Sequence, residues 1–103
     1  MAKLVHEIWL AADGLPSCVL AGPMGDSARK LIAEAGPRRL LRRFVAESHF
    51  EAMTIYNRIL GRGPYETDFL AQDAAPYPDA WRDAQEAAGV MAEDVAPELG
   101  PDA

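Results

Sequence analysis

The sequence predicts one α+β domain with a small, mainly antiparallel sheet of three to four strands and two helices on one face of that sheet. Strand-like runs flank a turn at Asp13-Gly14, and strong helix stop and start signals stand at Gly36-Pro37 and at Ser48. The 103 residues, half of them apolar, are enough for one hydrophobic core. We expect the domain to span residues 1–89, followed by a flexible acidic tail over residues 90–103.

Two strands are predicted at the start of the chain. Residues 3–11 are rich in β-branched and aromatic types, with His6 on one face and Glu7 and Trp9 on the other. The turn then leads into a short, mostly apolar strand over residues 17–21. The pair is therefore predicted to form a β-hairpin.

A first helix is predicted over residues 28–35. Asp26 or Ser27 can cap its start, because their side-chain oxygens reach free backbone N–H groups. Gly36 accepts a left-handed conformation and Pro37 cannot continue a helix, so the helix ends there.

Residues 38–46 fit two structures. As a helix they would place Leu40 and Phe44 on one face and the arginines on the other. However, a single residue between two helices leaves little room for the chain to reverse. Ser48 and Glu51 also have the spacing of a capping box, which belongs at the start of a helix. We therefore predict a strand.

The longest helix is predicted from Ser48 to Leu60, where apolar side chains recur at intervals of three and four residues. Residues 65–70 alternate again and predict a fourth strand at an edge of the sheet, followed by a loop over residues 72–78. A last helix over residues 79–88 would pack through Trp81, Ala84 and Ala88. The predicted order is ββαβα, with this further strand and helix after it.

One stretch of the chain is similar to a known pattern. It consists of the run Phe44-Val-Ala-Glu-Ser-His-Phe-Glu-Ala-Met-Thr-Ile-Tyr56, followed by Gly61 and by Gly63-Pro-Tyr65. It resembles a family of small uncharacterised bacterial proteins in which an apolar strand leads into S-x-x-E-A-M-x-x-Y and ends near G-x-x-P-Y. The resemblance covers about a fifth of the chain. It supports the strand over residues 38–46 and implies no activity, cofactor or catalytic residue.

The net charge of −6 is unevenly distributed. Residues 38–62 carry six Lys/Arg and two Asp/Glu, a net charge of +4. Residues 63–103 carry one Lys/Arg and ten Asp/Glu, a net charge of −9. The acidic balance argues against general nucleic-acid binding. No apolar run is long enough for a membrane span or for a secretion signal, so we expect a cytoplasmic protein.

The histidines suggest a candidate pocket at the start of the longest helix, lined by His49, Tyr56, Tyr65 and His6. Imidazole titrates near neutral pH and can act as a base or a metal ligand. The simpler interpretation is that Ser48 and Glu51 cap the helix and that His49 is their neighbour. No metal-binding spacing is present, so we predict neither a metal nor a cofactor.

Cys18 is the only cysteine, and its apolar surroundings predict a buried, unreactive thiol.

A second candidate surface combines four arginines with one aromatic residue: Arg38, Arg39, Arg42, Arg43 and Trp9. Guanidinium groups bind carboxylates and phosphates well. We predict first a non-enzymatic interaction or accessory module that binds another protein or a second copy of itself. The alternatives are a small enzyme or ligand-binding protein with its pocket near His49 and, more weakly, a nucleic-acid binder through Arg38–Arg43. Most of the aromatic residues are expected in the core, and one or two are expected on the open sheet face; they are Trp9, Trp81, Tyr65, Tyr77 and Phe69.

Overall fold

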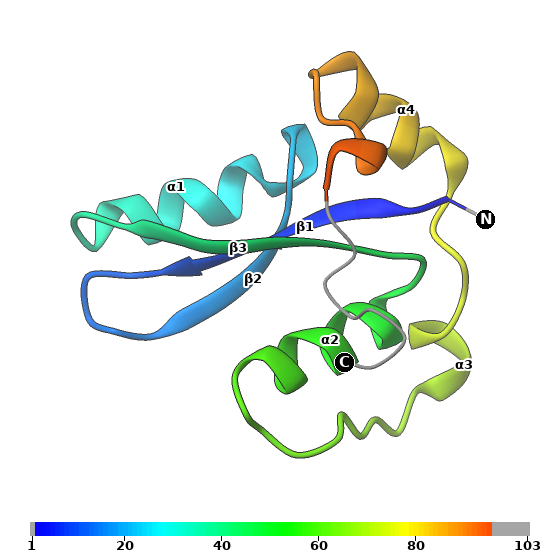
Figure 1. Cartoon of the computed structure of the whole chain (residues 1–103), viewed down its shortest axis with the longest axis horizontal. Coiled ribbons are helices and arrows are strands. Elements are labelled where there is room, and N and C mark those ends of the chain that lie inside the picture. Colours follow the sequence, from blue (N-terminus) through cyan, green and yellow to red (C-terminus); the bar gives the residue numbers. More distant parts are fainter. Residues whose placement is uncertain (1, 96–103) are drawn as a thin grey trace.

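The fold is centred on a three-stranded antiparallel sheet, seen in a computed structural model that describes residues 2–95. The strands are β1 (Leu4–Leu10), β2 (Pro16–Leu20) and β3 (Arg39–Ala46), in the order β2-β1-β3 (Figure 1). In the register, Ile8 of the central strand lies opposite Cys18 in β2 and Arg42 in β3. The hairpin and the strand over residues 38–46 are confirmed.

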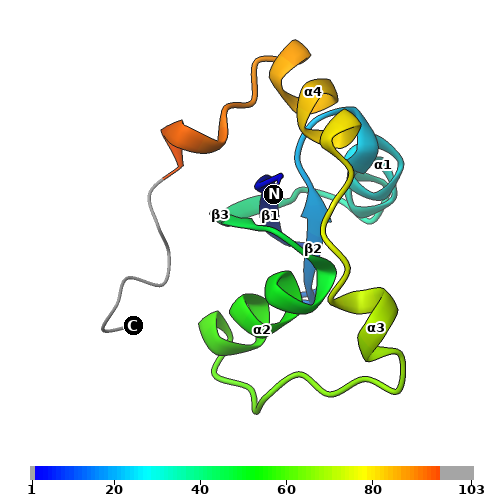
Figure 2. The same ribbon diagram turned by 90° about the vertical axis from the view of Figure 1, so that its right-hand side faces the viewer.

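The first two predicted helices lie on opposite faces of the sheet, which corrects the prediction that both cover one face. They are α1 (Asp26–Glu34) and α2 (His49–Ile59), and Figure 2 shows the sheet between them. Ile8 and Phe44 pack against α2, whereas the neighbouring Glu7 on the other strand face binds Arg29 of α1. Both faces of β1 are buried, so its apolar pattern does not show which face a helix covers.

The start of α2 follows the capping prediction. The hydroxyl oxygen of Ser48 accepts a hydrogen bond from the Glu51 N–H at 3.1 Å. In return, the Glu51 carboxylate accepts from the N–H of Glu47, one residue before the usual capping-box partner. These bonds start α2 at Ser48, shortly after the end of β3, and His49 therefore lies in the first turn of the helix.

Residues 65–70 do not form the predicted fourth strand. Among the described residues the sheet has three strands, and residues 64–68 are irregular, leading into the one-turn helix α3 (Leu70–Asp73). The strand-like contact beside the end of β3 is made instead by Pro76, in an isolated bridge with Ser48. Tyr77 extends this contact, because its N–H donates to the Glu47 carbonyl at 3.0 Å.

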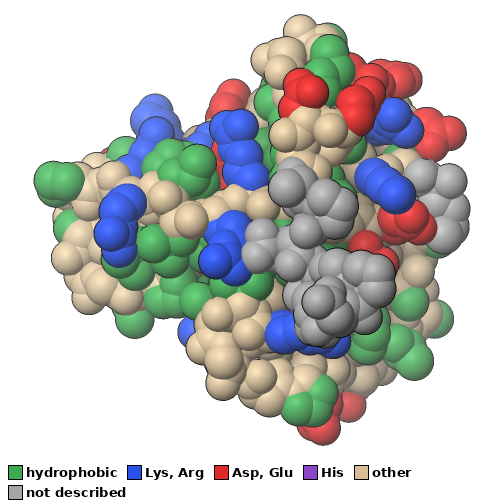
Figure 3. Space-filling model, viewed as in Figure 1, with side chains coloured by type: hydrophobic (Ala, Val, Ile, Leu, Met, Phe, Trp, Pro, Cys, Tyr) green, Lys and Arg blue, Asp and Glu red, His purple; other side chains and the backbone are tan. Residues whose placement is uncertain are grey.

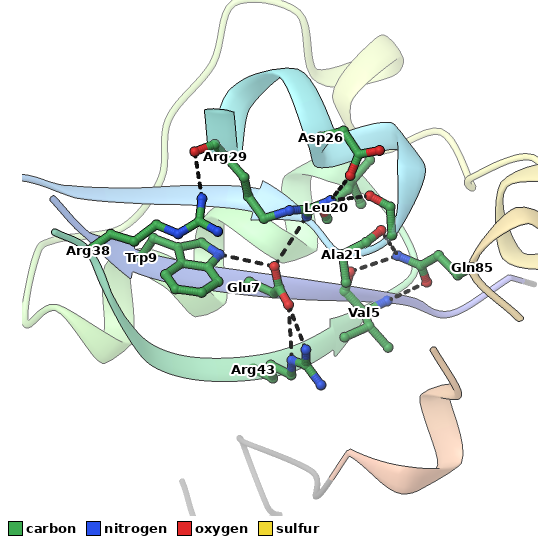
Figure 4. Close-up of polar contacts among 11 residues, drawn as sticks. Val5, Glu7, Trp9, Leu20, Ala21, Asp26, Arg29, Arg38, Arg43 and Gln85 are labelled. Atoms are coloured by element: carbon green, nitrogen blue, oxygen red, sulfur yellow. Dashed lines mark hydrogen bonds and ion pairs between the residues drawn. The ribbon is translucent and has the colours of Figure 1, made fainter. Parts of the chain in front are cut away.

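The last long helix, α4 (Asp79–Ala87), is held by a buried glutamine. Gln85 is 1 % exposed, and its side-chain amide accepts from the Val5 N–H and donates to the Val5 and Ala21 carbonyls, each at 2.9 Å (Figure 4). The amide therefore lies between the Val5 N–H and the Ala21 carbonyl, which face each other where the pairing of β1 with β2 ends. The prediction that Trp81 packs inward is wrong, since Trp81 is exposed.

Short 3-10 turns complete the described chain: η1 (Pro23–Gly25) precedes α1, and η2 (Ala92–Asp94) follows α4. The predicted tail began at residue 90; residues 90–95 contain η2, and residues 96–103 lie outside the described part of the chain. None of the helices in residues 2–95 combines the length and the apolar character needed to cross a bilayer.

Candidate ligand-binding site

A cavity of about 410 Å³ lies between β1 and β2, the start of α2 and the segment that joins α3 to α4. Figure 1 shows this segment running along one end of the sheet between the two helices. Apolar side chains dominate the wall, and a few polar side chains interrupt them. The lining residues are His6, Cys18, Val19, Leu20, His49, Met53, Gln72, Ala75, Pro76, Tyr77, Pro78 and Trp81.

The polar centre of the cavity wall is a hydrogen-bonded pair, His6 and Tyr77. The Nε2 atom of His6 lies 2.9 Å from the Tyr77 hydroxyl, and its Nδ1 atom lies 3.0 Å from the Leu4 carbonyl oxygen. The imidazole also stacks on the ring of Phe44 at 5.1 Å between centroids. These contacts hold His6 rigidly on the α2 face of the central strand.

Burial keeps three titratable groups of the wall, those of His6, Cys18 and Tyr77, uncharged. It lowers the pKa of His6 to about 4, the hydrogen bond to the Leu4 carbonyl opposing this only in part. Burial also raises the pKa of the Cys18 thiol to about 12 and raises the pKa of the Tyr77 hydroxyl. At neutral pH all three groups are therefore in their neutral forms.

The predicted pocket residues are only partly brought together. His49 lines the cavity from the first turn of α2 and is itself exposed. Tyr65 does not line it but touches His49 edge-on, with ring centroids 6.1 Å apart, and donates to the Asp73 carboxylate at 2.7 Å. Tyr56 faces the core under α2, where its hydroxyl donates to the Pro16 carbonyl.

Sequence reasoning missed Tyr77 and Trp81, which line the cavity, and it did not connect Cys18 with a pocket. Tyr77 stood in a predicted loop, 71 residues from the histidine that it bonds. A usable signal was present, because Pro76 and Pro78 flank Tyr77 and restrict the backbone on both sides. An aromatic residue held in this way is suited to a fixed place in a site.

The arginines of the second candidate surface have different surroundings. Arg38 lies 4.6 Å above the Trp9 ring and donates to the Arg29 carbonyl, whereas Arg43 binds the buried Glu7 carboxylate (Figure 4). Arg39 and Arg42 are exposed on the edge strand β3. Trp9 is half-buried beneath Arg38. Part of the predicted cluster thus serves contacts within the chain.

Charge is also segregated on the folded surface. In Figure 3, Lys and Arg side chains are scattered over the side that carries α1 and β3, and Asp and Glu side chains gather over α4. This agrees with the division of charge along the sequence.

The histidines do not form a metal site with a nearby acid. In residues 2–95 no group of three or more His, Cys, Asp or Glu side chains is arranged to hold a metal ion. Comparisons with protein-family models, with curated proteins and with solved structures find no match for this chain.

Proposed function

We propose that this protein is a non-catalytic binding protein whose cavity takes a small, uncharged, mainly apolar molecule. The observation that carries the proposal is the composition of the wall: apolar side chains surround a few polar groups, and His6, Cys18 and Tyr77 are all kept neutral. The volume of about 410 Å³ falls within the range of small-molecule sites.

The pKa values of His6, Cys18 and Tyr77 favour binding over acid–base or nucleophilic chemistry at these three groups. A general base works best when its pKa is near the ambient pH, and burial takes the pKa of His6 down to about 4. A reactive cysteine needs a thiolate, and burial takes the pKa of Cys18 up to about 12. Tyr77 is shifted away from ionisation as well. The same surroundings suit a ligand that brings no charge of its own.

An uncharged ligand also follows from desolvation. A charged group in this cavity would lose water and face mostly apolar side chains such as Leu20, Met53 and Trp81. Each of these side chains instead offers favourable contact to hydrocarbon or aromatic surface.

Binding of the neutral dye Nile red tests the proposal, because its fluorescence rises in an apolar site. Ala75 lines the cavity and is exposed at its mouth, whereas the neighbouring Ala74 is exposed but does not line it. We expect saturable binding to the natural chain, loss of binding in Ala75→Trp, and unchanged binding in Ala74→Trp. Equal binding by both variants, or none by the natural chain, would contradict a ligand site here.

The second candidate function is docking of an acidic protein partner at β3. It is supported by the position of β3 at the edge of the sheet and by the exposure of Leu40 (38 %) and Leu41 (39 %) beside Arg39. Immobilised protein should then retain a partner from the host at physiological ionic strength. Arg39→Glu should abolish retention, while Lys30→Glu on the exposed side of α1 should not. Retention that is insensitive to Arg39→Glu would rule out this surface.

A further inference from the structure

We infer that the ligand carries a hydrogen-bond donor, an O–H or N–H group, which the hydroxyl oxygen of Tyr77 accepts. This inference rests on the proposed function, since it describes the molecule that the cavity takes. It follows from the direction of the hydrogen bonds that link Leu4, His6 and Tyr77.

The first bond determines which nitrogen of His6 carries the proton. The Leu4 carbonyl can only accept, so Nδ1, at 3.0 Å from it, must be the donor. A neutral imidazole has a single N–H, and His6 is neutral because burial lowers its pKa to about 4. Nε2 is therefore an acceptor.

The second bond then determines the orientation of the Tyr77 hydroxyl. Because Nε2 accepts, the proton of the hydroxyl must point to His6 across the 2.9 Å contact. The oxygen retains only its lone pairs for any other partner. A ligand carbonyl or ether oxygen at this point would face lone pair against lone pair, whereas an O–H or N–H group would complete the chain of bonds.

The backbone holds Tyr77 in place for this role. Its N–H donates to the Glu47 carbonyl at 3.0 Å, and Pro76 forms the bridge with Ser48. Its ring lies against Trp81, with centroids 5.8 Å apart. The hydroxyl therefore keeps its position without a ligand, and the preference for a donor is built into the site.

The other polar side chains of the wall do not impose the same preference. Gln72 and His49 are exposed, so solvent competes with a ligand for their polar groups. The Cys18 thiol is a weak donor and a weak acceptor. Among these side chains, Tyr77 alone therefore selects between ligands that donate and ligands that accept a hydrogen bond.

Indole and benzofuran provide the test, because they have nearly the same shape and differ in an N–H donor against an oxygen acceptor. Their affinities are measured by displacement of Nile red. We expect the natural chain to bind indole about five-fold more tightly than benzofuran, the value of one ordinary hydrogen bond. Tyr77→Phe should remove the preference, so that indole and benzofuran bind with equal affinity. The matched control Tyr65→Phe removes a hydroxyl that binds Asp73 outside the cavity and should keep the preference.

A second variant tests the direction of the bonds independently of Tyr77. His6→Phe keeps a ring that can stack on Phe44 but removes the acceptor, so the Tyr77 proton is free to point to the ligand. The preference should then shift towards benzofuran. If Nile red binds and is blocked by Ala75→Trp, but indole and benzofuran bind equally to the natural chain, this inference fails and the proposed function stands. If Nile red does not bind, the proposed function fails, and this inference fails with it.

Discussion

The carboxylate of Glu7 lies against the guanidinium group of Arg43, with Oε2 and Nη2 2.9 Å apart, although Glu7 itself is 4 % exposed. Its second oxygen lies 3.3 Å from Arg29 of α1 and accepts from the Trp9 indole N–H at 3.0 Å. One buried acid on the central strand thus connects β3 with α1 across the face opposite to the cavity (Figure 4).

Removing this acid should destabilise the fold strongly. Glu7→Gln leaves Arg29, which is largely buried, with only the exposed Asp26 as a counter-charge, and neutralising one partner of a buried pair in this way costs about 2 kcal/mol of unfolding free energy. Urea denaturation measures the change. Glu86→Gln is the control, because the Glu86–Arg82 pair is at the surface and should contribute less than about 1 kcal/mol. Equal effects of the two changes would contradict the role of Glu7.

Gln85 should be essential for docking α4. Gln85→Met keeps the length of the side chain but removes the partner of the Val5 N–H and of the Ala21 carbonyl, while the Val5 carbonyl keeps the Ala21 N–H, at a cost of roughly 2 kcal/mol. Hydrogen exchange should show faster exchange of the Val5 amide and of α4. The exposed Gln72 provides the comparison, since Gln72→Met should leave both unchanged. Protection of the Val5 amide in Gln85→Met would contradict this prediction.

Stability should fall at acid pH through His6. Its pKa is about 4 in the folded chain against 6.5 for an ordinary histidine, so the unfolded chain binds the proton more readily. The contribution is complete above pH 6.5 and is lost as the pH falls towards 4, with a total of roughly 3 kcal/mol. Denaturation curves across this pH range should show a steeper loss for the natural chain than for His6→Phe. Parallel losses in the two proteins would show that His6 is not responsible.

Cys18 should react slowly with thiol reagents. Burial raises its pKa from 9.0 to about 12, which lowers the thiolate fraction at neutral pH about a thousandfold. Alkylation by iodoacetamide, followed by mass spectrometry, measures the rate. The double change Cys18→Ser and Ala12→Cys moves the thiol to an exposed position and should restore an ordinary rate. Because Cys18 lines the cavity, Nile red should slow its alkylation further.

Local signals in the sequence determined the division of the chain into elements. The turn at Asp13-Gly14 separates β1 from β2. Gly36, with a φ of 123°, follows the C-cap of α1 and prevents the helix from continuing. Ser48 caps α2 as its spacing from Glu51 predicts. These features depend on backbone sterics and on bonds between neighbouring residues, which are written into short stretches of chain.

The tertiary structure alone decided which faces are covered and where the cavity lies. Residues 65–70 have the alternation of a strand, yet it is Pro76, from the segment after α3, that makes the isolated bridge with Ser48. Glu7 is charged and yet buried, because Arg29 and Arg43 reach it from distant elements. His6 and Tyr77 meet across 71 residues of sequence. Such contacts depend on how the whole chain packs, so no local pattern encodes them.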